Sequence, residues 1–121
     1  MKQLILVFVG GGLGSVLRYL IGKWLYHVEN AIPYGTFAAN IIGSLLIGII
    51  LGLAEKSETL SQNQTVLLAT GFCGGFTTFS SFAYENYLFL KNGDFSIFAI
   101  YTILSFILGF SAVFLGIYIV K

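Results

Sequence analysis

The segment that decides the fold reads Gly71-Phe72-Cys73-Gly74-Gly75-Phe76-Thr77-Thr78-Phe79-Ser80-Ser81-Phe82, in the middle of a long apolar stretch. Its glycines weaken a helix, and hydroxyl side chains follow them closely. Irregular backbone is tolerated at membrane depth only where it is buried in protein or lines a cavity. The segment therefore predicts a helix broken inside a membrane, with free carbonyls at one half-helix end and free N–H groups at the other. A kink that only aids packing is the alternative.

The composition around this segment is that of an integral membrane protein. The chain has 121 residues, of which 57% are hydrophobic and only 9% charged, whereas a soluble domain carries about 25% charged residues. The net charge of +1 leaves no electrostatic footprint for nucleic acid. The single cysteine, Cys73, excludes an internal disulfide, and the sequence holds no zinc set, phosphate loop or hydrolase motif. We therefore expect a membrane protein that is not an enzyme.

Apolar runs long enough to cross a bilayer, about 20 residues each, occur in four places. We predict one all-α domain over residues 1–121, with spans at about residues 4–26, 34–53, 64–90 and 95–120. Polar turns separate the spans at His27–Pro33, Ala54–Asn63 and Lys91–Asp94, and His27 is expected to be solvated. The first run is interpreted as a span and not as a signal peptide, because no small-residue cleavage site follows it. The protein is expected in the cell membrane (plasma or inner).

Basic residues are divided almost evenly between the two sides of the predicted bundle. One side carries Lys2, Lys56 and Lys121, and the other carries Lys23 and Lys91. The excess of Lys and Arg that fixes the orientation of a membrane protein is therefore missing. Either one basic residue near the first span decides, or the chain inserts both ways and pairs head to tail with a second copy. We favour the second interpretation, an antiparallel dual-topology homodimer.

Small residues recur along one face of three spans. They are Gly10 and Gly14; Ser44, Gly48 and Gly52; and Gly109, Ala112 and Gly116. Small side chains let helix backbones approach closely, which drives packing inside a bilayer. The pattern predicts a dense helical bundle.

A few polar side chains are expected at membrane depth outside the broken segment. Asn40 either bonds to another helix or lines a pathway, where its NH2 group is a donor for an anion. Tyr101 and Ser105 are four residues apart and place two hydroxyls on one face of the last span. Arg18 and Glu85 either reach the interface, pair with each other, or lie at a vestibule where an arginine gathers anions.

Phe79 and Phe82 lie three residues apart, on one helical face beside the hydroxyls. Packing in the core or against lipid is the ordinary role of such rings. However, the edge of an aromatic ring is electropositive and can face an anion without a fixed charge. Because no Lys or Arg lies centrally in the last three spans, these residues favour a small, polar-lined pathway for an anion.

Three motifs resemble the CrcB/Fluc family of fluoride-specific ion channels over essentially the whole chain. They are Gly10-Gly11-Gly12-Leu13-Gly14 with Arg18-Tyr19; Gly35-Thr36 with Asn40 and Gly43-Ser44; and the broken segment quoted above. The resemblance implies a passive channel that exports fluoride and so reduces its toxicity. It also implies an antiparallel homodimer with two pores and a central sodium ion that is structural and not transported.

The same resemblance assigns roles to residues. Backbone carbonyls of Gly74 and Thr77 would hold the sodium ion, and Arg18 and Glu85 would be vestibule or structural charges. The implied ion pathway consists of Asn40, Thr78, Phe79, Ser81, Phe82, Tyr101 and Ser105. A further hydroxyl is expected one turn after Ser105, where this chain has Gly109, so the outer part of the pathway stays unassigned.

Two other functions fit the same length and charge balance. A proton-coupled exporter of the small multidrug type needs a buried carboxylate in the first span, which has none. A non-transporting scaffold subunit would leave the polar interruption of the third span without a purpose.

Overall fold

The computed structural model describes residues 1–26, 32–57 and 60–121. His27, most of the turn predicted around it, and part of the turn predicted at 54–63 lie outside these residues. Within the described part the fold is entirely helical, without a strand. Four stretches are long and apolar enough to cross a membrane: Lys2–Trp24, Tyr34–Lys56, Gln62–Lys91 and Phe95–Val120. The prediction of an all-α, multi-pass membrane protein is confirmed.

Three of these stretches are single helices, α1 (Lys2–Trp24), α2 (Tyr34–Ser57) and α6 (Phe95–Val120). Helix α2 continues past residue 53, where the apolar run ends, because Ala54, Glu55 and Lys56 are strong helix formers. The third stretch consists of four pieces, α3 (Gln62–Thr65), the π-helical segment η1 (Val66–Cys73), α4 (Gly74–Phe76) and α5 (Phe79–Lys91).

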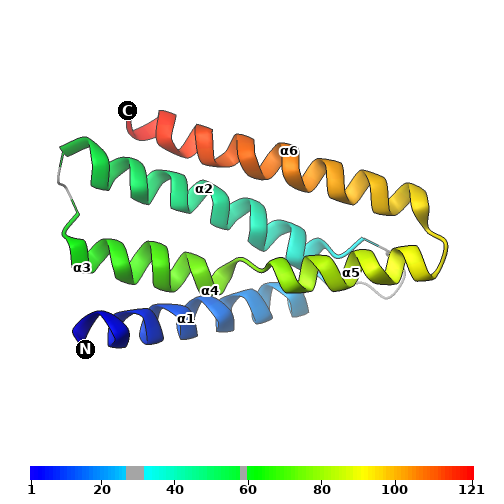
Figure 1. Cartoon of the computed structure of the whole chain (residues 1–121), viewed down its shortest axis with the longest axis horizontal. Helices are drawn as coiled ribbons and strands as arrows, with labels where there is room; N and C mark the ends of the chain where they lie inside the picture. The colour runs from blue at the N-terminus through cyan, green and yellow to red at the C-terminus, as the bar shows by residue number, and fades with distance from the viewer. Residues whose placement is uncertain (27–31, 58–59) are drawn as a thin grey trace.

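The four stretches lie side by side (Figure 1), with the composite third stretch between α1 and α2, and α6 against the other side of α2. Both termini lie at the same end of the bundle. At the opposite end, a tight turn joins α5 to α6. Gly93 adopts φ 79° there, in the left-handed region that favours glycine.

The break in the third stretch lies at Thr77 and Thr78. Thr77 is extended (φ −88°, ψ 158°), and so is Thr78 (φ −151°, ψ 121°), whereas Gly71, Gly74 and Gly75 remain helical. The broken helix was predicted, but the glycines are not where the chain leaves the helix. Thr78 instead caps the next helix, because its hydroxyl accepts a hydrogen bond from the N–H of Ser81 at 3.2 Å.

The glycines serve close packing between backbones. A Cβ atom on Gly10 would overlap the Leu67 carbonyl oxygen, and one on Gly75 would overlap the carbonyl oxygen of Gly11. Helix α1 therefore touches η1 and α4 backbone to backbone. Helices α2 and α6 meet in the same way, because a Cβ on Gly116 would overlap the carbonyl oxygen of Leu45. These contacts agree with the dense packing that the small-residue faces predict.

Candidate ion pathway

A groove of about 370 Å³ runs along the bundle beside the broken helix. It is lined by Asn40, Gly43, Ser44, Ile47, Cys73, Gly74, Thr77, Thr78, Phe79, Phe82, Ser105, Phe106, Gly109, Phe110 and Val113. None of these residues carries a charge. Five of the seven predicted pathway residues belong to this lining: Asn40, Thr78, Phe79, Phe82 and Ser105. The other two, Ser81 and Tyr101, do not.

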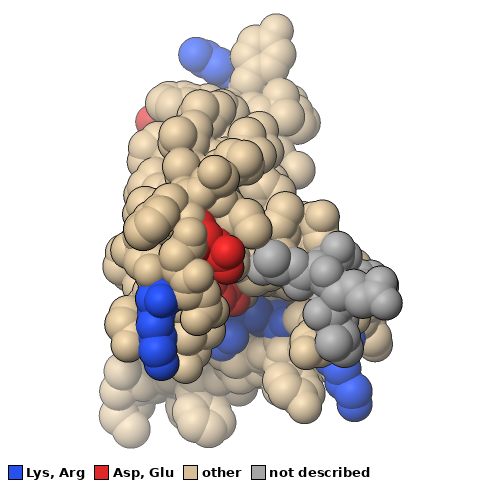
Figure 2. Space-filling model, turned by 90° about the vertical axis from the view of Figure 1, so that its right-hand side faces the viewer, with Lys and Arg blue, Asp and Glu red and all other residues tan. Residues whose placement is uncertain are grey.

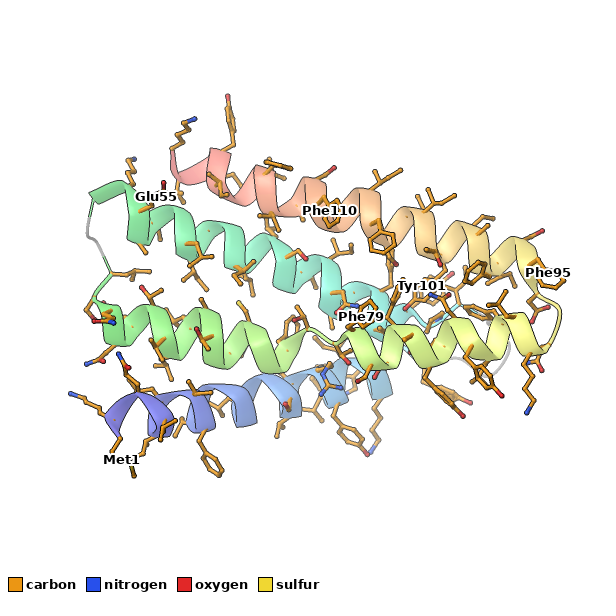
Figure 3. All side chains as sticks on the ribbon, in the orientation of Figure 1. Met1, Glu55, Phe79, Phe95, Tyr101 and Phe110 are labelled. Atoms are coloured by element: carbon orange, nitrogen blue, oxygen red, sulfur yellow. The ribbon has the colours of Figure 1, made fainter. Side chains whose placement is uncertain are left out.

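The two predicted phenylalanines occupy very different environments. The rings of Phe79 and Phe82 lie 6.0 Å apart, centroid to centroid, at an interplanar angle of 43°. Phe82 is 7% exposed and belongs to a buried aromatic cluster with Phe89 and Tyr101. Phe79 is 74% exposed at the start of α5, next to the break (Figure 3). Phe82 is therefore a packed wall of the groove, whereas Phe79 projects from the surface of the described chain.

Asn40 joins α2 to the break by two hydrogen bonds. Its Nδ2 donates to the Thr78 carbonyl at 3.1 Å, and its Oδ1 accepts from the Thr78 N–H at 2.8 Å. The Asn40 side-chain amide thus pairs with the extended residue Thr78 and satisfies both the N–H and the carbonyl of its backbone. Asn40 therefore bonds across helices, as one of its two predicted roles requires, and it also lines the groove. Its role in an ion pathway stays a prediction.

The side chains at the break divert the amides that would otherwise close the helix. In a continuous helix the Thr78 N–H would donate to the Gly74 carbonyl, and the Ser81 N–H to that of Thr77. These two N–H groups instead donate to Asn40 Oδ1 and Thr78 Oγ1. The carbonyls of Gly74 and Thr77 are thereby released from their helical hydrogen bonds.

The neighbouring carbonyl, that of Gly75, has partners from α1. Arg18 Nε donates to it at 3.1 Å and Ser15 Oγ at 3.3 Å. Both side chains come from the helix whose glycines contact η1 and α4. Arg18 therefore supports the carboxyl end of the broken half-helix, where a cation is favourable.

Glu85 is half-buried on α5 and accepts hydrogen bonds from two hydroxyls. Thr36 Oγ1 donates to Oε2 of this carboxylate, and the Tyr101 hydroxyl donates to Oε1 at 2.7 Å. In the part of the chain that the structure describes, no ion pair joins Glu85 to Arg18, so mutual pairing is not what stabilises these two charges. Thr36 was not among the predicted site residues. The sequence signal that could have identified Thr36 is its position four residues, or one helical turn, before Asn40, which places both side chains on one face of the helix.

A second hollow, of about 430 Å³, opens near the end of α1. It is lined by Arg18, Tyr19, Gly22, Lys23, Tyr26, Gly35 and Thr36. Thr36 connects this hollow to Glu85 and Tyr101, and the Tyr101 ring lies 5.1 Å from that of Phe82. A series of contacts therefore runs from a basic hollow to the uncharged groove.

The fold and these contacts define a small multi-pass membrane protein with a groove of uncharged polar, aromatic and apolar residues beside a broken helix. Residues 5–117 match the family described as CrcB-like protein, Camphor Resistance (CrcB). The chain is 54% identical to a protein of Gloeothece citriformis (strain PCC 7424) named fluoride-specific ion channel FluC, with 100% of this chain and 98% of the relative covered. The chain therefore belongs to the CrcB-like family, as the three motifs predicted.

Other relatives support this assignment. A Bacteroides fragilis protein with the same name is 46% identical, over 98% of this chain and 96% of the relative. One from Leptospira interrogans is 40% identical, over 99% of this chain and 95% of the relative. These relatives are named as ion channels, which are not enzymes, and this agrees with the expectation that the chain is not an enzyme.

Proposed function

We propose that the protein is a passive, fluoride-selective channel of the cell membrane, which exports fluoride and so reduces its toxicity. The observation that carries this proposal is the groove, which is lined by hydroxyls, one amide and aromatic rings without any charged side chain. The membership of the family and the names of its relatives support fluoride as the ion.

The lining suits a small anion that must exchange its water shell for protein donors. Ser105 and the second N–H of Asn40 offer hydrogen bonds, and Phe79 and Phe82 offer ring edges between them. Because no fixed positive charge lies in the groove, the anion is bound weakly enough to leave again. Arg18 and Lys23 at the second hollow would raise the local anion concentration at the entrance.

The working form in this proposal is an antiparallel homodimer with two pores. The groove is open along the surface of the bundle, and Phe79 and Phe110 at its edge are 74% and 64% exposed. An ion path open to lipid would leave the ion without polar partners, so another wall is required. A second copy in the opposite orientation supplies that wall to each groove.

The same proposal includes a structural sodium ion at the break. Unwound backbone carbonyls are typical sodium ligands in membrane proteins, and those of Gly74 and Thr77 are released from the helix as described above. Gly74 is exposed, and a Cβ there would meet only the Ala69 carbonyl oxygen at 4.0 Å, so packing within the chain does not require glycine. A bound sodium ion would supply positive potential and brace the two half-helices.

Fluoride efflux from liposomes tests the function. Purified protein reconstituted in vesicles loaded with potassium fluoride should release fluoride to an electrode when valinomycin is added, and vesicles loaded with chloride should release little. A chloride efflux equal to that of fluoride would reject selectivity. Efflux that stops when a proton gradient is collapsed would instead support the proton-coupled exporter.

Phe79→Ile tests the aromatic part of the pathway. Because Phe79 is exposed in the bundle, its replacement should leave folding intact while fluoride efflux falls at least about ten-fold. Phe82→Ile should lower efflux as well, but it removes a buried ring and is expected to lower stability by about 1–3 kcal/mol. Undiminished efflux in both variants would contradict the role of the rings.

A further inference from the structure

The hydroxyl row on α6 stops before the groove does. Tyr101, Ser105 and Gly109 follow one another at four-residue spacing, and Ser105 and Gly109 both line the groove. Gly109 has no side chain to offer. An ion that moves along this wall beyond Ser105 therefore meets no donor side chain from α6 at the next turn.

Close packing does not account for the glycine at position 109. A Cβ on Gly48 or Gly116 would overlap backbone of the facing helix, so those two glycines are needed where α2 meets α6. A Cβ on Gly109 would make only ordinary contacts, with Ser44 Oγ at 3.8 Å and Ile41 Cδ1 at 4.0 Å. The site has room for a side chain, and the nearest atom to that room is a hydroxyl oxygen.

That hydroxyl belongs to α2. Ser44 is half-buried, lies one turn after Asn40 and lines the same groove. Asn40 and Thr78 are already bonded to each other, whereas Ser44 Oγ has no hydrogen-bond partner among the described residues. A serine hydroxyl rotates freely and can turn its hydrogen toward an anion. The absence of a side chain at Gly109 leaves Ser44 uncovered.

We infer that Ser44 is a fluoride-binding and selectivity residue of the pathway, and that its hydroxyl supplies the hydrogen bond that α6 lacks at Gly109. This inference rests on the proposed function. It assigns the outer part of the groove to a donor from α2 and makes Ser44 and Gly109 a complementary pair. A hydroxyl on either helix at this level serves the ion, because a side chain added at position 109 would enter the space beside the Ser44 hydroxyl.

Reciprocal substitution tests the pair in the liposome efflux assay. Ser44→Ala should lower fluoride efflux about ten-fold, because a hydrogen bond to a charged group is lost. Ser44→Ala/Gly109→Ser should recover efflux to within about three-fold of the unmodified chain, since the hydroxyl returns from α6. Ser44→Thr, which keeps the hydroxyl, should conduct. Ser111→Ala is the matched control, because Ser111 is exposed on α6 outside the groove.

Each result decides the inference. Size-exclusion profiles and melting temperatures will check that every variant is folded. Ser44→Ala is expected to fold because alanine favours a helix more than serine does. Undiminished efflux in Ser44→Ala, or a folded double variant no better than Ser44→Ala, would overturn the role of Ser44 while the proposed function stands. An unmodified chain that carries no fluoride would reject the proposed function and this inference with it.

Discussion

Asn40 shows how one side chain can serve both the fold and the path. Its two bonds to Thr78 hold the extended residue at the break, and the diverted Thr78 amide is what releases the Gly74 carbonyl. The side-chain amide of Asn40 also lines the groove. In the proposed channel, structure and conduction would therefore depend on the same few atoms.

Substitution of Asn40 separates its two hydrogen bonds. Asn40→Ala removes both and should lower the free energy of unfolding by about 1–2 kcal/mol, with fluoride efflux lost. Asn40→Asp keeps the oxygen that accepts from the Thr78 N–H, so it should melt at a higher temperature than Asn40→Ala. It places a negative charge in the groove, however, and efflux should still be lost.

Thermal melting in detergent, read beside liposome efflux, measures the two effects. If Asn40→Ala melts like the unmodified chain, the amide does not hold the break. If Asn40→Asp conducts fluoride normally, the groove near this residue is not the ion path.

At the scale of elements, the contact of α1 with η1 and α4 depends on glycine. A Cβ on Gly14 would overlap the Phe72 carbonyl oxygen and lie 2.8 Å from the Phe76 nitrogen. Gly14→Ala should therefore separate the helices and destabilise the protein by about 2 kcal/mol or more. Gly12 is the matched control, because nothing lies within 4 Å of a Cβ there. Gly12→Ala should be neutral or raise stability by about 0.5–1 kcal/mol.

Melting temperatures of the two variants in one detergent measure this difference. Equal melting of Gly14→Ala and Gly12→Ala would show that the backbone contact contributes little. A large loss confined to Gly14→Ala would show that the absence of a side chain at Gly14 determines how closely the broken helix packs against α1.

The elements differ in how far the sequence predicts them. The apolar runs predict the four helical stretches, because the thickness of a bilayer sets their length. The break was predicted within the segment 71–80, but its place at Thr77 and Thr78 was not. That place depends on Asn40 from another helix and on the Thr78 cap, which are contacts between segments far apart in sequence. The π-helical form of η1 has no signal in residue periodicity either.

In the candidate site, too, local sequence predicts some features, whereas contacts between distant segments determine others. Hydroxyl and amide residues near the break were predicted as site residues because polar side chains at membrane depth need a partner or a function, and Phe79 and Phe82 because they share one helical face beside the hydroxyls. The bonds of Glu85 to Thr36 and Tyr101 join three helices and were not predictable from spacing along one of them. The two charges predicted near the membrane have separate neutral partners, and this arrangement is a property of the folded bundle.

At the scale of the whole molecule, charge is sparse and nearly balanced between the two ends. Viewed at the end where α5 meets α6, a few basic and acidic side chains are set in a mostly uncharged surface (Figure 2). Lys2, Lys56 and Lys121 lie at the opposite end of the bundle, where α1 begins and where α2 and α6 end. Because neither end has a clear excess, small changes in charge should decide the orientation.

Two exposed substitutions at each end test insertion in both directions. Gln3→Lys/Gln62→Lys adds positive charge at the end with the termini, and Asn92→Lys/Ser96→Lys adds it at the opposite end. Each variant should insert in one orientation only and, because antiparallel pairs cannot form, should show fluoride efflux at least about ten-fold lower than the unmodified chain. Co-expression of both variants should restore efflux, since each supplies the wall that the groove of the other lacks. Efflux from either variant alone at the level of the unmodified chain would reject the antiparallel dimer.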